Sequence, residues 1–138
     1  MILEAIQQTN PEFYQQLGKL FFAIANADNS IRNEELKRLE EVLKTEWTDL
    51  NQVDTVAKNT IIETFKWLES DHEYDSDTCY TSFVNYKRAH ESIFDNDIKS
   101  LIMKTAAKIA SSYNSQNKSE LIMLANLDLE FKRHTSDS

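Results

Sequence analysis

Glycine, proline and cysteine are almost absent from this sequence: each occurs once, as Gly18, Pro11 and Cys79. β-Hairpins and the loops of α/β folds use glycine and proline heavily, because their turns need a positive φ or a φ fixed in advance. The scarcity of both residues therefore disfavours a β-rich fold and excludes a glycine-rich phosphate-binding loop. With a single cysteine, the chain forms neither an internal disulfide nor a zinc site made of several cysteines.

Excess positive charge and long apolar runs are also missing. The formal net charge is −8, which disfavours nucleic-acid binding because basic groups must displace the counterions of a phosphate backbone. The longest strongly apolar run, 20–25, is far shorter than the roughly 20 residues that span a membrane. Glu4 and the lack of a basic cluster at the start do not resemble a signal peptide. We therefore expect a cytoplasmic protein without direct membrane insertion.

Apolar residues make up 41% of the chain and recur at helical spacing. This pattern predicts six amphipathic helices: one starting at Asn10-Pro11, three near 33–47, 52–69 and 77–94, one from Asp95 to about 113, and one starting at Asn117. The sequence also allows a short helix at 2–8. No linker or low-complexity tract divides these elements. We expect a single compact all-α helical bundle over residues 1–134, followed by a frayed tail at 135–138.

The two ends of the chain resemble each other at a constant offset of 85 residues. Residues 25–35 return in weaker form at 110–120, and the pair Asn29-Ser30 is matched by Asn114-Ser115. Any two amphipathic hairpins would match their apolar faces, but that does not explain a shared Asn-Ser turn. We therefore expect two pseudo-repeated helical hairpins that flank a central helix pair. Each hairpin would turn on an asparagine in the left-handed conformation.

The segment 25–35 reads Ala-x-Ala-Asp-Asn-x-Ile-x-x-x-Glu and resembles the Ala-x-Ala-Asp-Gly-x-Ile-x-x-x-Glu motif of the TerB-like (tellurite-resistance protein B) superfamily. That family is an all-α domain of paired hairpins that carries the motif twice, and its members are associated with tellurite and chemical-stress resistance. The resemblance implies a divalent-cation site formed by Asp28, Glu35 and Glu120. Asparagine replaces the motif glycine in both copies, and Tyr113 replaces the second aspartate.

The same three carboxylates also have a purely structural interpretation. Glu35 and Glu120 fall in the first turns of predicted helices, where a carboxylate satisfies free N–H groups and interacts favourably with the helix dipole. Asp28 has the residue type that commonly caps a turn. Capping and metal binding therefore both remain open from the sequence. An EF-hand is excluded, because Leu39 stands where the last ligand of a loop starting at Asp28 would be a glutamate.

Two other groups of residues are weighed as functional sites. The acidic segment 69–77 is typical of a solvated loop, although an acidic patch also attracts cations or a basic partner. Cys79 and His90 share a helical face, but three turns separate them by roughly 16 Å along the axis, which excludes a contacting nucleophile pair within one helix. Four aromatic residues could form an adhesive surface near the acidic loop but are predicted to be partly buried instead: Trp47, Trp67, Tyr74 and Tyr80.

We expect a non-enzymatic, small acidic binding or scaffold domain that engages a protein partner in a stress (tellurite) response. An enzyme is disfavoured, because no pair of titratable groups has the spacing of a known catalytic motif. The alternative is an immunity- or inhibitor-type protein whose charge of −8 steers it to a basic protein partner.

Overall fold

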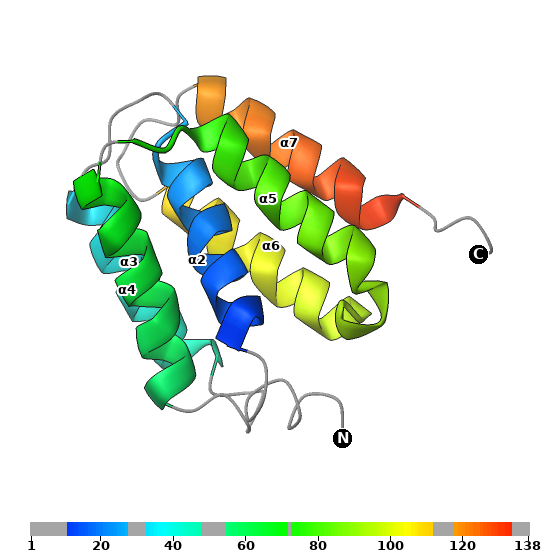
Figure 1. The fold of residues 1–138 in the computed structure, drawn as a ribbon, viewed down its shortest axis with the longest axis horizontal. Coiled ribbons are helices and arrows are strands. Elements are labelled where there is room, and N and C mark those ends of the chain that lie inside the picture. The colour runs from blue at the N-terminus through cyan, green and yellow to red at the C-terminus, as the bar shows by residue number, and fades with distance from the viewer. Residues whose placement is uncertain (1–10, 28–32, 48–54, 72, 112–117, 134–138) are drawn as a thin grey trace.

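The computed structural model describes residues 11–27, 33–47, 55–71, 73–111 and 118–133. These residues form six α-helices and one 3-10 turn, with no strand among them, and the helices assemble into one compact bundle (Figure 1). No described helix has both the length and the apolar character needed to cross a membrane. The elements are α2 (Pro11–Ala25), α3 (Asn33–Thr45), α4 (Thr55–Asp71), α5 (Ser76–Ala89), η2 (Glu91–Ile93), α6 (Asn96–Ala110) and α7 (Lys118–Lys132).

Helix α2 is the central helix of the bundle. Every residue from Leu20 to Ala25 is buried, as expected of a helix surrounded by other elements. It packs mainly against α4 and α5 and also contacts α6 and α7. Pro11 is its first residue, which confirms the predicted start, because proline lacks only an N–H group that has no helical partner there.

The single glycine lies at a close approach of α2 and α4. A Cβ atom added at Gly18 would lie 2.7 Å from Thr64 Cβ and 2.9 Å from the Ile61 carbonyl oxygen. Both distances are shorter than a normal van der Waals contact, and neither atom is at the end of a flexible side chain. Gly18 therefore has a packing role that outweighs its poor helix propensity.

Aromatic side chains fill the core on the side of α5 and η2. Phe94, which follows η2, makes edge-to-face contacts with Phe13 at 5.6 Å and with Phe83 at 5.8 Å between ring centroids. On the opposite side, buried Trp47 packs on Phe21. The Trp47 indole Nε1 donates a hydrogen bond of 2.9 Å to Thr105 Oγ1 of α6. This bond satisfies the only polar atom of the buried indole ring.

Two sequence expectations about helix positions are corrected. The helix predicted to run to residue 94 ends at Ala89, where His90 leaves helical geometry at φ −136° and ψ 45° and the chain enters η2. Leu121, which belongs to the apolar pattern of the helix predicted to start at Asn117, has 44% of its surface exposed. The buried face of α7 is formed by Met123, Leu127 and Phe131. Because α7 carries apolar residues on more than one face, its periodicity does not select the correct one.

The 85-residue offset recurs in the helix bounds. Helix α6 begins and ends 85 residues after α2, and α7 begins 85 residues after α3. The two helix pairs, α2 with α3 and α6 with α7, pack against each other. Helix α3 lies mainly against α6, and α7 contacts α2 as well as α6. Asn29 and Asn114, on which the predicted hairpins turn, lie outside the described residues, as does the suggested helix at 2–8.

Candidate functional site

Two of the three predicted metal ligands belong to the described structure. Glu35 and Glu120 lie in the first turns of α3 and α7, and each side chain is only 1% exposed. Asp28 lies outside the described residues. Among the residues described, no group of three or more histidine, cysteine, aspartate or glutamate side chains is placed to hold a metal ion. A metal site at these three residues therefore stays a prediction.

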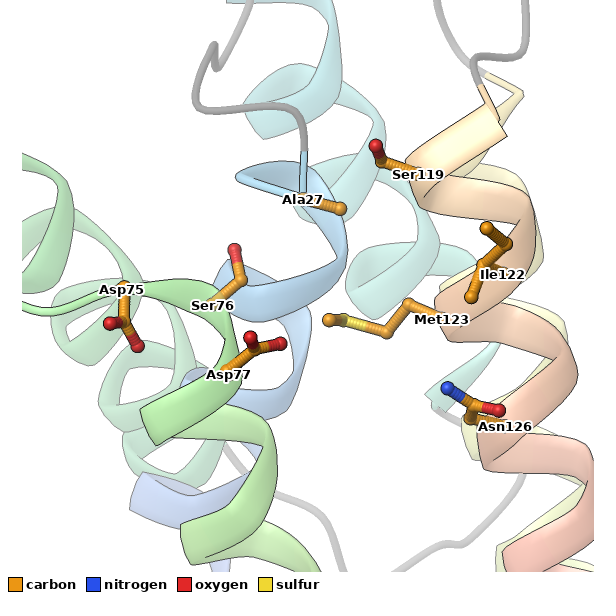
Figure 2. A pocket seen from close by; sticks show the side chains of 8 residues that line it. All are labelled: Ala27, Asp75, Ser76, Asp77, Ser119, Ile122, Met123 and Asn126. Atoms are coloured by element: carbon orange, nitrogen blue, oxygen red, sulfur yellow. The ribbon is translucent and has the colours of Figure 1, made fainter.

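An acidic pocket of about 330 Å³ lies at one end of the bundle, where α5 and α7 both begin and α2 has just ended (Figure 2). Figure 2 shows Asp77 of α5 and Met123 of α7 extending toward each other from opposite sides. We refer to this cavity as the acidic pocket. Its lining residues are Ala27, Asp75, Ser76, Asp77, Ser119, Ile122, Met123 and Asn126.

Helix capping fixes the acidic side of this pocket. Asp75 precedes α5, and its Oδ1 atom accepts a 2.7 Å hydrogen bond from the Thr78 backbone N–H. The hydrogen bonds from Thr78 hold the pKa of Asp75 below its usual value. Ser76 is 8% exposed, and its hydroxyl has no hydrogen-bond partner within the described structure. The pocket thus contains a carboxylate held in its charged form beside a buried hydroxyl that has no hydrogen-bond partner among the described residues.

The lining of the acidic pocket suits a positively charged ligand. Its side-chain oxygen atoms come from Asp75, Asp77, Ser76, Ser119 and Asn126, and none of its described lining residues is a lysine or an arginine. Carboxylate, hydroxyl and amide oxygens are the atoms that hard cations prefer, and they also accept hydrogen bonds from basic side chains. Ile122, which borders the pocket, is 53% exposed.

The acidic segment 69–77, predicted as a solvated loop, is largely helical at its two ends. Helix α4 continues to Asp71, and α5 already begins at Ser76. Residues 73–75 connect to α5 and are exposed. The sequence identified this acidic segment, but no motif indicated Ser119, Ile122 or Asn126 on the facing helix.

Cys79 and His90 have different surroundings in this structure. The Cys79 side chain is 2% exposed, and burial raises the pKa of its thiol. His90 stacks on the Tyr86 ring at 4.2 Å between ring centroids, and its Nδ1 atom lies 2.9 Å from the Tyr86 carbonyl oxygen. Cys79 is thus part of the core, whereas the His90 ring packs on Tyr86.

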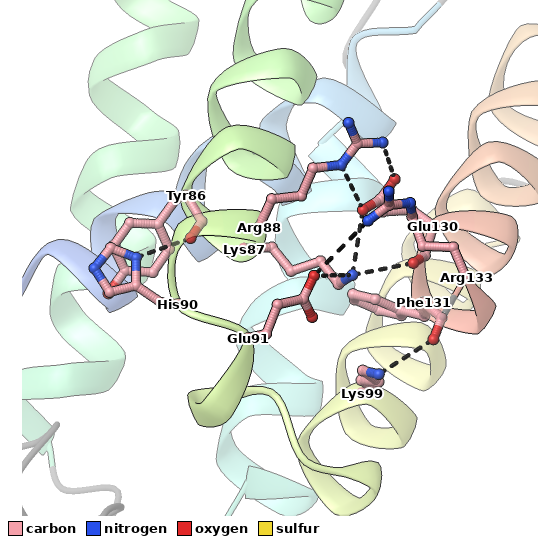
Figure 3. A network of polar contacts seen from close by, with 9 residues as sticks. All are labelled: Tyr86, Lys87, Arg88, His90, Glu91, Lys99, Glu130, Phe131 and Arg133. Carbon is pink, nitrogen blue, oxygen red and sulfur yellow. Dashed lines mark hydrogen bonds and ion pairs between the residues drawn. The ribbon is translucent and has the colours of Figure 1, made fainter. Parts of the chain in front are cut away.

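A second polar cluster joins α5 to the end of α7 (Figure 3). Lys87 is fully buried, and its Nζ atom donates hydrogen bonds to Glu91 Oε2 at 3.2 Å, Glu130 Oε2 at 3.2 Å and the Glu130 carbonyl at 3.1 Å. Arg88 binds the same carboxylate through two hydrogen bonds of 3.0 and 2.7 Å. Burial acts to raise the Glu130 pKa, but the hydrogen bonds from Arg88 and Lys87 outweigh it and hold the pKa below its usual value.

This Lys87 cluster is structural rather than a site for ligands. Its central ammonium is inaccessible to solvent and already saturated by three acceptors. Lys99 donates to the neighbouring Phe131 carbonyl at 3.2 Å. Together the two lysines satisfy carbonyl groups at the end of α7 and place positive charge at the negative end of its dipole.

Comparisons of the chain with protein-family models, with curated proteins and with solved structures find no match.

Proposed function

We propose that this chain is a non-enzymatic binding domain of the TerB-like type and that it recognises a positively charged ligand at the acidic pocket. The observation that carries the proposal is the lining itself. It brings Asp75 and Asp77 together with the unpartnered, buried Ser76 hydroxyl, and no basic side chain contributes to it among the described residues. A divalent cation is the simplest such ligand.

Two observations support the TerB-like part of the proposal. The helix bounds repeat at the 85-residue offset of the motif copies. Glu35 and Glu120, which are equivalent under this offset, are both buried at the starts of their helices. A role in a stress (tellurite) response is the biological context that the resemblance adds to this proposal.

Calorimetry on chelator-treated protein tests the proposal directly. Calcium, magnesium, manganese and zinc are titrated separately to millimolar concentration, and at least one is expected to give saturable heat. Asp77→Asn is expected to weaken that binding about tenfold or more, because it removes one charged oxygen ligand. The matched control is Asp97→Asn, because Asp97 has the same position in α6 that Asp77 has in α5, two residues after a capping aspartate. Saturable heat that Asp77→Asn leaves unchanged would show that the cation binds elsewhere.

A basic protein partner, as expected of an immunity- or inhibitor-type protein, is the second candidate. The observation that favours it is the apolar surface of α7 beside the acidic pocket, where Ile122 and Leu121 are 53% and 44% exposed. A partner with a basic side chain for the pocket and apolar contacts for α7 would fit both features. This candidate predicts no heat with any of the four cations. It also predicts capture of a basic protein that Asp77→Asn and moderate salt both weaken.

A further inference from the structure

A smaller cavity of about 210 Å³ lies between α2, α4 and α5, beside the acidic pocket but separate from it. Residues 75–77 line the acidic pocket, whereas Tyr74, Thr78 and Cys79 line the smaller cavity, so the start of α5 lies between the two. Lys19 and Trp67 contribute from α2 and α4. The chemistry of this second cavity is the opposite of that of the acidic pocket.

An exposed aromatic pair forms one wall of the second cavity. Trp67 and Tyr74 are 54% and 40% exposed, and their ring centroids lie 5.4 Å apart with the planes tilted by 46°. All other tryptophan, tyrosine and phenylalanine side chains in the described residues are buried or partly buried. Exposed aromatic surface next to a cavity is typical of a site that stacks against a flat apolar group.

A lysine that has no acidic partner within the described part of the chain forms the polar end of the cavity. Lys19 Nζ donates a 3.3 Å hydrogen bond to Ser82 Oγ, and Ser82 donates in turn to Gln16 Oε1 at 3.2 Å. Gln16 is 6% exposed, so it fixes the Ser82 hydroxyl from inside the bundle. No carboxylate of the described residues forms an ion pair with Lys19. In a chain with a net charge of −8, this ammonium group is therefore available to an anion from outside.

The local electrostatics agree with an anion site. Burial raises the pKa of the Cys79 thiol, Lys19 acts in the opposite direction, and this effect of Lys19 exceeds the raising effect of Asp75. Lys19 therefore places a positive charge beside Cys79 at the wall of the cavity. Leu68 completes the apolar lining and is 1% exposed.

We propose that this cavity binds a small planar aromatic carboxylate. The ring of the ligand would lie against the Trp67–Tyr74 pair, and its carboxylate would accept hydrogen bonds from Lys19 Nζ. A cavity of about 210 Å³ holds one such ring. The site does not depend on the proposed function, because it uses different side chains and a ligand of opposite charge.

The two tryptophans allow a binding experiment with an internal control, because one lines the cavity and the other is buried elsewhere. In a ¹H–¹⁵N correlation spectrum of the whole protein they give two indole N–H peaks, which Trp67→Phe assigns. Benzoate is the probe, and it is expected to shift the Trp67 peak saturably, with a Kd of about 1 mM as for other fragment-sized ligands. The Trp47 peak is the internal reference, because its N–H is buried on Thr105 Oγ1. A Trp67 peak that does not move, or that moves without saturating, would overturn the proposal.

Two ligand analogues separate the contribution of the ligand's charge from that of its aromatic ring, and three variants test the role of Lys19. Benzamide, which lacks the charge, and cyclohexanecarboxylate, which lacks the aromatic ring, are each expected to bind at least about fivefold more weakly. Lys19→Met is expected to weaken benzoate binding about tenfold, and Lys19→Arg to retain it. The control is Lys66→Met, because Lys66 is adjacent to Trp67 but faces α3, where it pairs with Glu40 at 4.0 Å. An unshifted Trp47 peak shows that each variant is folded. Equal binding of benzoate by Lys19→Met and Lys66→Met would refute the assigned role of Lys19.

Discussion

Removing the ammonium group of the buried Lys87 should destabilise the bundle. We consider Lys87→Met, which keeps most of the aliphatic chain near Phe131 and removes only the ammonium group. The change deletes three hydrogen bonds, to Glu91, to the Glu130 carboxylate and to the Glu130 carbonyl. It also leaves the Glu130 carboxylate, which is 7% exposed, with one positive partner instead of two.

The expected loss in free energy of unfolding depends on the charge that remains buried after the substitution. Removing one partner of a buried ion pair costs about 3–5 kcal/mol, mainly because the other charge remains buried and unpaired. Here Arg88 still holds Glu130 through two hydrogen bonds, so we expect the lower end of that range, about 3 kcal/mol. The control is Lys104→Met, because Lys104 is 53% exposed and shares Glu46 with Lys108. Exposed ion pairs contribute about 0–1 kcal/mol.

Urea unfolding followed by far-UV circular dichroism measures both losses. With a slope of about 1–3 kcal/mol/M, a loss of 3 kcal/mol lowers the midpoint by about 1–3 M. The double variant Lys87→Met/Glu130→Leu should be more stable than Lys87→Met, because it leaves no carboxylate at position 130 to be buried. If Lys87→Met and Lys104→Met have the same free energy of unfolding, or if the double variant is the less stable, the reasoning about buried charge is wrong.

Three further predictions concern Glu130, Gly18 and Cys79. Because its folded pKa lies below the usual 4.5, Glu130 stabilises the fold above the unfolded pKa and loses this effect as the pH falls toward the folded pKa. The free energy of unfolding should therefore fall less steeply below about pH 5 in Glu130→Gln than in the wild type, and identical pH profiles would contradict this. Gly18→Ala should destabilise the protein by about 1–2 kcal/mol in urea unfolding, since overpacking against Thr64 and Ile61 exceeds the gain in helix propensity of about 1 kcal/mol. A stabilised variant would show that α2 and α4 separate easily. Cys79, 2% exposed and with a raised pKa, should react with a thiol reagent at least about a hundredfold more slowly in native than in urea-unfolded protein, and comparable rates would place the thiol outside the core.

The all-α bundle could be predicted because local and tertiary preferences agree in most of the chain. Pro11 and Asp95 mark helix starts where the structure has them, and Asp95 Oδ1 accepts the expected hydrogen bond from the Ile98 N–H at 2.9 Å. The periodic apolar face that begins at Phe13 is buried throughout α2. Such capping and periodicity depend on residues within one or two turns of each other, so a single sequence contains the required information.

Helix ends and faces that depend on distant residues were predicted less well. Helix α5 ends at Ala89 although the apolar pattern continues, because η2 turns Phe94 into the core between α2 and α5. Trp67 and Tyr74 were predicted to be partly buried, yet both are exposed and pair with each other across the end of α4. In these cases the outcome depends on what another helix covers, which the local pattern does not specify.

The acidic pocket shows most directly why a site is harder to predict than a fold. The chain contains the same arrangement twice, a capping aspartate followed two residues later by a second aspartate, as Asp75 and Asp77 before α5 and as Asp95 and Asp97 before α6. Both caps form the same hydrogen bond, at 2.7 and 2.9 Å. Only the first pair lines the acidic pocket, because the start of α7 lies across from α5 at that end of the bundle. Local sequence therefore explains why the carboxylates are ordered and charged. The position of a helix more than forty residues later in the chain determines which pair can bind a ligand, so Asp77→Asn and Asp97→Asn should differ in binding although they alter the same local motif.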